Sequence, residues 1–128
     1  MTSATATTRV CFQLLIRPDL LDEYIARHTP VWPDMLAEIA AAGRRNYSLF
    51  LSDDGLLIGY FETDNLEASQ AALADSPTAA RWEAEMAPFF VSLAGRPDQS
   101  AIPLPEIFHL EDQLADAEAS AIAESDAS

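Results

Sequence analysis

The chain has 128 residues, of which 49% are hydrophobic, and this length and composition predict one domain with a buried core. Its formal net charge of −14 arises from 21 acidic residues against seven basic ones. Such a charge repels phosphate backbones, which argues against nucleic acid and anionic membranes as partners.

Several features favour a cytoplasmic protein. No apolar run approaches the roughly 18 residues that a membrane helix needs, so no membrane partner is expected. Residues 1–8 have neither a basic start nor an apolar run, and we interpret them as a flexible N-terminus rather than a signal peptide. The single cysteine, Cys11, cannot form an internal disulfide, which fits a reducing compartment.

The first part of the chain predicts a strand and two helices. Residues 9–17 place apolar side chains at every second position, as a strand does. A helix is expected over residues 20–28 and another from about Pro33 to Ala42. The Thr29-Pro30 pair interrupts them, since the residue before a proline resists helical geometry.

The remaining elements follow in the same manner. Strands over residues 45–52 and 56–63 are predicted to form a hairpin around Asp53-Asp54-Gly55. The later expectations are a helix capped by Asn65 to about Ala74, a helix from Ser76-Pro77 to near Leu93, a loop over residues 96–105 and a last strand over Pro105–Leu110.

The order β-α-β-β-α-β over residues 9–110 predicts an α+β, ferredoxin-like fold. In this fold a four-stranded antiparallel sheet carries its helices on one face. Residues 9–17 and 56–63 are apolar on both faces, so neither face is suited to water. We therefore expect two copies to cover the second face by forming a two-fold dimer.

The C-terminal segment, residues 111–128, differs from the rest of the chain. It contains six acidic residues, no basic residue and only two large apolar residues, Leu114 and Ile122. Because it can bury little surface, we interpret it as an acidic tail, either a frayed helix or disordered.

The most informative motif lies in the first predicted helix. There Leu21, Tyr24, Ile25 and His28 share one face, so two proton-carrying side chains lie on an apolar stripe. Histidine can both give and take a proton near neutral pH, and a phenol one turn away adds a donor and an acceptor. The pair is interpreted either as buried core residues or as an acid–base site.

Three further aromatic residues allow the same two interpretations, as core residues or as residues of a binding site. Trp32, between two prolines, either fills the gap at the helix break or contacts a ligand, and Tyr47 is a strand residue or a ligand donor. Trp82 shares a helix face with Met86 and is also a core candidate. No metal-ligand spacing or Gly-rich phosphate loop is present, so no metal and no cofactor are expected. Flat aromatic faces suit sugars, because they cover the C–H patches of a pyranose.

Four segments together resemble the L-rhamnose mutarotase family. They are Glu23–Met35, which holds Tyr-x-x-x-His-x-x-Val-Trp-Pro, then Arg45–Leu51, the Arg81-Trp82 pair and Glu106–Leu110. The resemblance covers about residues 9–110. It implies a homodimeric α+β barrel, an isomerase that interconverts the α and β anomers of L-rhamnose or a related 6-deoxy sugar.

The resemblance also implies roles for single residues. His28 is the proton donor, and Tyr24 and Tyr47 bind the sugar. An aromatic pair of the family encloses the sugar, and here it is Trp82-Glu83, with a carboxylate in place of the second aromatic ring. Trp32 completes the expected substrate-binding set.

Two alternatives differ in class. One is a cofactor-free monooxygenase on the same barrel, which would need an apolar pocket for an aromatic substrate. The other is a non-catalytic dimeric module that binds a small ligand. Mutarotation needs only a proton donor for the ring oxygen and an acceptor for the proton of the anomeric hydroxyl. The acceptor is either Tyr24, a catalytic candidate with His28, acting through a water, or a carboxylate that the sequence does not identify.

Overall fold

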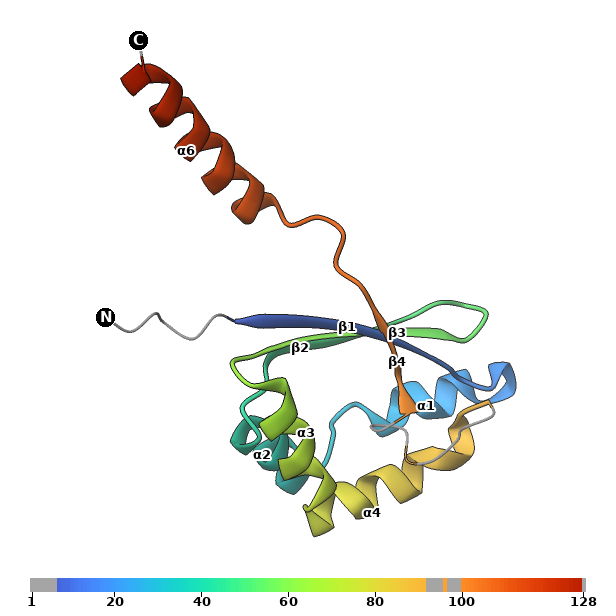
Figure 1. Ribbon diagram of the computed structural model, residues 1–128. Helices are drawn as coiled ribbons and strands as arrows, with labels where there is room; N and C mark the ends of the chain where they lie inside the picture. Colours follow the sequence, from blue (N-terminus) through green and yellow to red (C-terminus); the bar gives the residue numbers. More distant parts are fainter. Residues whose placement is uncertain (1–6, 92–95, 97–99, 128) are drawn as a thin grey trace.

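The computed structural model describes residues 7–91, 96 and 100–127, and it forms a sheet with helices against one side (Figure 1). Most of the expected N-terminal segment 1–8 lies outside the described residues. The strands are β1 (Thr8–Leu15), β2 (Arg45–Leu51), β3 (Leu56–Thr63) and β4 (Ile102–Leu104). The α-helices are α1 (Leu21–Arg27), α2 (Pro33–Ala41), α3 (Leu66–Ala74), α4 (Pro77–Met86) and α6 (Leu110–Ala127), with short 3₁₀ helices η1 (Pro18–Leu20) and η2 (Ala87–Phe89).

The four strands form one antiparallel sheet in the order β2-β3-β1-β4. This is the predicted ferredoxin-like arrangement, with consecutive strands β2 and β3 as a hairpin at one side and β1 in the interior. Helices α1 to α4 lie on one face of the sheet, as Figure 1 shows, and α6 lies on the opposite side. The α+β fold class and the position of the helices are confirmed. None of the described helices has both the length and the apolar character needed to cross a membrane.

The two faces of β3 show how the sheet divides the molecule. Leu57, Gly59, Phe61 and Thr63 are buried toward the helices, while the residues between them are only half-buried. The buried hydrophobic core lies between sheet and helices and comprises Ile16, Tyr24, Met35, Leu57, Leu73, Ala79, Trp82, Met86, Phe89 and Phe90. The core therefore includes two residues, Tyr24 and Trp82, that the sequence marked as site candidates.

Local signals set two helix starts as predicted. The side chain of Asn65 accepts a hydrogen bond from the Ala68 amide, and the Ser76 hydroxyl accepts one from Ala79. Each satisfies an amide that has no partner within its helix. These caps fix where α3 and α4 begin, and α4 carries the Trp82-Glu83 pair.

The predicted helix to near Leu93 is wrong in length. Helix α4 ends at Met86, and the chain tightens into η2 around Pro88, which lacks an amide donor and cannot continue an α-helix. Phe90 is already extended and bridges to Ile16, and the Val91 amide donates to the Leu15 carbonyl at 2.9 Å. Leu93 itself lies outside the described residues.

The last strand is also misplaced in the sequence prediction. Strand β4 is Ile102–Leu104, inside the predicted loop, and residues 105–109 have no regular structure. Pro103 fits there because β4 is at the edge of the sheet, where a strand tolerates a residue without an amide donor. Pro105 follows directly after the strand. The neighbouring apolar residues Ile107 and Phe108 of the predicted strand are instead exposed, at 92% and 60%.

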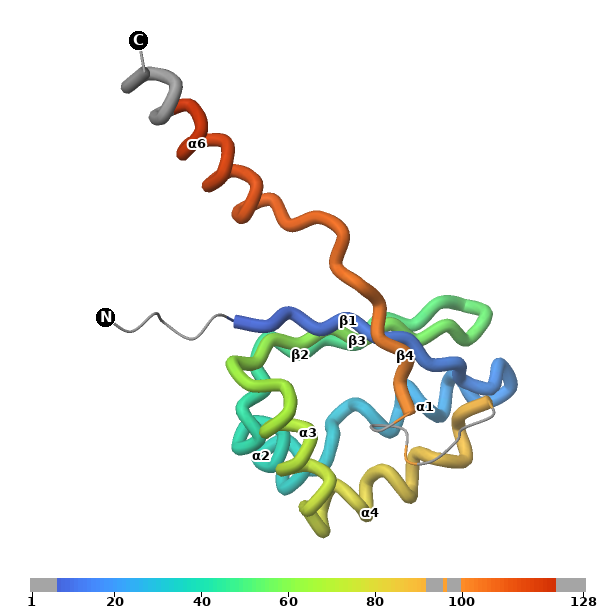
Figure 2. The backbone as a smooth tube through the Cα atoms, viewed as in Figure 1, coloured from blue at the N-terminus to red at the C-terminus, as the bar shows by residue number. Residues whose placement is uncertain are grey.

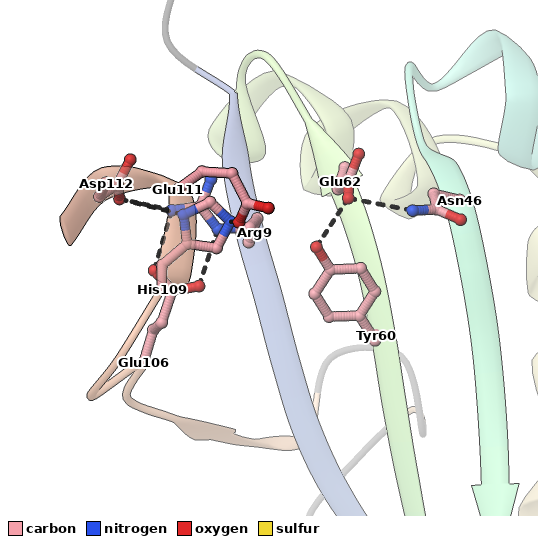
Figure 3. Close-up of polar contacts among 8 residues, drawn as sticks. All are labelled: Arg9, Asn46, Tyr60, Glu62, Glu106, His109, Glu111 and Asp112. Carbon is pink, nitrogen blue, oxygen red and sulfur yellow. Dashed lines mark hydrogen bonds and ion pairs between the residues drawn. The ribbon is translucent and has the colours of Figure 1, made fainter. Parts of the chain in front are cut away.

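The acidic segment forms helix α6, which extends away from the domain as the tube in Figure 2 shows. All of its side chains from Leu110 to residue 121 are exposed. Of the two sequence interpretations of this segment, the structure has the helix rather than disorder. Figure 3 shows how its start is fixed. Arg9 of β1 donates to Glu106 at 2.7 and 3.0 Å and to Asp112 at 3.1 Å, and His109 lies 3.3 Å from Asp112.

We predict that Gly59→Ala destabilises the fold and disturbs the cavity described below. A Cβ at Gly59 would lie 2.1 Å from the ring of Phe12, which in turn contacts Tyr47 and Phe61. Moving that ring is an overpacking change that costs about 1–3 kcal/mol. Thermal unfolding followed by circular dichroism should show a clear drop in Tm. The exposed Ser48→Ala on β2 is the control and should leave Tm unchanged, and an unchanged Tm for Gly59→Ala would contradict the packing.

Candidate active site

A cavity of about 270 Å³ lies between the helix side of the sheet and helices α1, α3 and α4. Its lining includes the sequence candidates Tyr24, His28, Tyr47, Trp82 and Glu83, together with apolar residues of β1 and β3. A second cavity, of about 540 Å³, extends from it toward α2 and shares His28, Tyr47, Trp82 and Glu83. The structure thus brings five of the six candidates into one place, from three separate segments of the chain.

Helix α1 delivers Tyr24 and His28 together. They are four residues apart, so both side chains lie on the helix face that packs against α4 and η2, and their ring centroids are 4.3 Å apart. Tyr24 is 5% exposed and contacts the rings of Phe89 and Phe90. His28 directly follows α1 as its C-cap and is half-buried. The apolar surroundings hold both rings in place at the cavity wall.

The hydrogen bond of His28 selects one ring nitrogen for chemistry. His28 Nδ1 lies 2.8 Å from the backbone carbonyl of Tyr24, which can only accept, so Nδ1 carries the proton. In the neutral ring, Nε2 is then the nitrogen without a proton. Nε2 is therefore the atom at which His28 can take up and release a proton.

Burial sets the protonation of this pair. Removal from water lowers the pKa of His28 below its ordinary 6.5, partly offset by the hydrogen bond to the Tyr24 carbonyl. Burial also raises the pKa of Tyr24, with smaller contributions from Tyr47 and Glu83. Tyr24 accordingly stays a neutral phenol that can donate a hydrogen bond, whereas His28 titrates on the acid side of neutrality.

Helix α4 contributes an aromatic residue and a carboxylate side by side. Trp82 is 7% exposed, and its ring meets His28 edge-on with centroids 5.3 Å apart. Glu83, the next residue, is 8% exposed and lines both cavities. Trp32 does not join these linings. It lies edge-on to Trp82 at 5.1 Å, on the core side, so it supports Trp82 as a packing partner.

A β-bulge turns Tyr47 toward the cavity. Arg45 pairs with Glu62 and Ser48 with Tyr60, so Asn46 and Tyr47 together oppose a single residue, Phe61. The bulge needs a positive φ of 54° at Asn46, a conformation that asparagine tolerates well. As Figure 3 shows, the Asn46 side chain donates to Glu62 at 3.1 Å. The ring of Tyr47 then lies 5.2 Å from that of Phe61, on the helix side of the sheet.

Two polar residues of the cavity, Arg44 and Gln70, are not among the site residues predicted from the sequence. Arg44 is 7% exposed, donates from Nε to Ser69 at 2.8 Å, also bonds Gln70, and lies over the Phe61 ring at 4.0 Å. It follows Gly43 in a loop, where an arginine is usually solvated, so no periodic pattern marks it. The only signal was its rarity, as one of seven basic residues in an acidic chain.

These features define the class of the protein: a ferredoxin-like α+β protein with a polar and aromatic cavity for a small molecule. A model of the family described as L-rhamnose mutarotase matches residues 9–110. The chain belongs to the L-rhamnose mutarotase family, and the resemblance read from its motifs is confirmed.

Individual relatives agree with this assignment. The chain is 36% identical over 106 residues to the L-rhamnose mutarotases of Yersinia pestis (strain Pestoides F) and Yersinia pseudotuberculosis (serotype O:1b, strain IP 31758), covering 80% of this chain and 98% of each relative. The solved structure of L-rhamnose mutarotase FA22100 from Formosa agariphila superposes with a TM-score of 0.65 at 24% identity, covering 80% of this chain and 97% of that one. The latter likeness concerns the fold.

Proposed function

We propose that this protein is an isomerase that interconverts the α and β anomers of L-rhamnose, or of a related 6-deoxy sugar, without a cofactor. The family match over residues 9–110 and the relatives named L-rhamnose mutarotase support this function. The observation in the structure that carries it is the cavity in which His28, Tyr24, Tyr47 and Trp82 meet.

The proposed reaction begins with His28. Its imidazolium form donates the Nε2 proton to the ring oxygen of the sugar while the anomeric hydroxyl loses its proton, and the bond between the anomeric carbon and the ring oxygen breaks. The open aldehyde turns about its bond to the next carbon. The ring closes on the other face of the carbonyl, the base returns its proton to the new anomeric hydroxyl, and the ring-oxygen proton returns to His28. Well-placed acid–base groups supply about 10²–10⁴-fold in such steps.

The other residues are proposed to bind and orient the sugar. Tyr24, a buried neutral phenol, donates a hydrogen bond at the cavity wall and is the second candidate for proton transfer. Tyr47 is 36% exposed and lies where a ligand can reach it, while the face of Trp82 covers the C–H side of a pyranose. Glu83 bonds sugar hydroxyls, and Trp32 acts through its contact with Trp82.

The two alternative functions are less well supported by this cavity. A monooxygenase for aromatic substrates would favour an apolar pocket, whereas here Arg44, Glu83, Gln70 and His28 line the wall. A non-catalytic binding module has no need for a histidine with one nitrogen fixed and the other available for proton exchange.

The direct test is anomeric exchange measured by saturation-transfer NMR. We expect micromolar protein to accelerate α/β exchange of L-rhamnose, with L-fucose, L-lyxose and D-glucose run as comparison sugars. Exchange with boiled protein gives the uncatalysed rate. If folded protein accelerates no sugar, the mutarotase proposal is wrong and a binding module is favoured, and oxygen uptake with a phenol would favour the monooxygenase.

We also propose that the protein is a homodimer and resides in the cytoplasm. The sheet face opposite α1 to α4 carries exposed Leu15, Phe50 and Ile102, at 53%, 62% and 57%, and Ile107 and Phe108 beyond β4 are exposed as well. Paired positions such as Phe50 with Ile58 put these side chains on the same face. A second copy seated on this face would cover it and complete an α+β barrel.

A further inference from the structure

Glu83 is the one acidic residue among the described lining of the cavities at His28. It is 8% exposed, whereas Glu85, two residues on, is exposed and pairs with Arg27 at 3.1 Å. Acidic residues are rarely buried unless their charge is compensated or used. The sequence resemblance implies an aromatic ring at this position, so the carboxylate is a particular feature of this chain.

The surroundings of Glu83 suit an ionised carboxylate. Arg44 lines both of the same cavities and is 7% exposed, so a permanent positive charge lies in the same polar wall. Burial raises the pKa of Tyr24, and the nearby Tyr47 and Glu83 raise it further. Glu83, Tyr24 and His28 all line the same cavity. A carboxylate, the Tyr24 phenol and the His28 ring therefore converge on one small volume.

We propose that Glu83 is the catalytic base that accepts the proton of the anomeric hydroxyl, as the partner of the proton donor His28. This inference rests on the proposed mutarotase function and supplies the acceptor that the sequence left open. Mutarotation requires one group to give a proton while another takes one. A histidine and a carboxylate that line the same cavity supply both roles.

The proton count balances. In the starting state His28 is an imidazolium and Glu83 a carboxylate. On ring opening, Nε2–H of His28 transfers its proton to the ring oxygen, the O–H proton of the anomeric hydroxyl moves to Glu83, and the C–O ring bond breaks as the carbonyl forms. His28 is then neutral and Glu83 is a carboxylic acid. Ring closure reverses both transfers, so no proton is exchanged with solvent.

The charged and titratable groups that share this volume are few. From α1 and its C-cap they are Tyr24 and His28, and from the segment that runs into β2 they are Arg44, Arg45 and Tyr47. Two nearby carboxylates lie outside this volume. Glu85 of α4 forms an ion pair with Arg27, and Glu38 of α2 accepts a hydrogen bond from the Ser76 hydroxyl at the start of α4. The pH dependence of catalysis is therefore assigned to the pair His28 and Glu83.

The test compares Glu83→Gln with Glu85→Gln, a substitution of the same kind on the same helix. Glu83→Gln should lower kcat for anomeric exchange by about 10²-fold or more, with KM changed by less than roughly threefold, whereas Glu85→Gln should retain wild-type exchange. The wild-type rate should fall at acidic pH, where a carboxylate base becomes protonated, and this acid limb should be absent in Glu83→Gln. Glu83→Asp should retain more activity than Glu83→Gln.

Chemical rescue gives an independent readout that a structural role would not produce. Added formate should raise exchange by Glu83→Ala by about tenfold or more, because an external carboxylate can occupy the space and take the proton. Formate should leave wild type and Glu85→Ala unchanged. Circular dichroism of each variant checks the fold. If the Glu83 variants do not fold, the test is whether the rate of the folded wild type falls at acidic pH, and a rate that does not fall would contradict a carboxylate base.

The outcomes separate this inference from the function on which it rests. A wild-type protein that exchanges no sugar overturns the mutarotase proposal itself. Two results with an active wild type would overturn the role of Glu83 as base and leave it a binding residue. One is a Glu83→Gln variant that keeps the full kcat, whether or not its KM is raised. The other is a Glu83→Ala variant that formate does not rescue.

Discussion

Replacing His28 by asparagine is expected to lower anomeric exchange of L-rhamnose by about 10²-fold or more, because asparagine keeps a polar group but cannot supply a titrating proton. Tyr24→Phe should lower it less, since only a hydroxyl is removed and the buried ring remains. Saturation-transfer NMR on the same samples used for thermal unfolding gives exchange per folded molecule.

The pH dependence of exchange adds a second signature for His28. Burial lowers the pKa of His28 below 6.5, so the imidazolium needed as proton donor is lost as the pH rises through that lowered value. Catalysed exchange, after subtraction of the uncatalysed rate, should therefore decline above it. His28→Asn should lack this decline.

The free energy of unfolding should change with pH in the opposite direction to catalysed exchange. The folded state prefers neutral His28, so between the lowered pKa and 6.5 the unfolded chain binds more protons. The free energy of unfolding should therefore decrease as the pH falls from 7 through this window. His28→Asn should remove that contribution.

A purely structural His28 would give a different pattern. His28→Asn would then lower Tm while exchange per folded molecule stayed at the wild-type value. Trp82→Ala is a useful comparison, because it removes a buried ring and should weaken sugar binding more than it slows the chemical step. Full exchange by folded His28→Asn would contradict the proposed proton transfer.

Replacing Phe50 by aspartate is expected to convert the proposed dimer into monomers. Phe50 is 62% exposed on the sheet face opposite the helices, and a stable interface of about 1,200–2,000 Å² would bury it near Ile58. A charge placed there costs desolvation without a partner. Sedimentation velocity at micromolar concentration should show the wild type as a dimer and Phe50→Asp as a monomer.

Two controls make this result specific to that face. Ile25→Asp changes an apolar residue of 52% exposure on α1, on the helix side of the molecule, and should remain dimeric. Deletion of residues 113–128 removes most of α6 but keeps Asp112, which contacts Arg9, and should alter neither assembly nor exchange. A monomeric wild type would contradict the dimer, and loss of the dimer on deletion would assign α6 to the interface.

The sequence by itself determined the element order and most residues of the candidate site. Alternating apolar residues, the Asp53-Asp54-Gly55 turn and the caps at Asn65 and Ser76 are local signals, so β1 to β3 and the helix starts were predictable. Tyr24 and His28 were also predictable as a pair, because helical spacing alone puts residues four apart on one face.

The tertiary structure decided the rest, for reasons that involve distant residues. Strand β4 forms at Ile102–Leu104 because these residues pair with the edge of β1. The local sequence does not show which segment reaches that edge, so the strand was predicted at residues 105–110 instead. The bulge at Asn46 and Tyr47 depends on how β2 pairs with β3, and it alone turns Tyr47 toward the cavity. The burial of Arg44 and Glu83 follows from the fold, which brings the segment before β2 and helix α4 to the same cavities, because a charged residue shows no periodic signal of burial until its neighbours are in place.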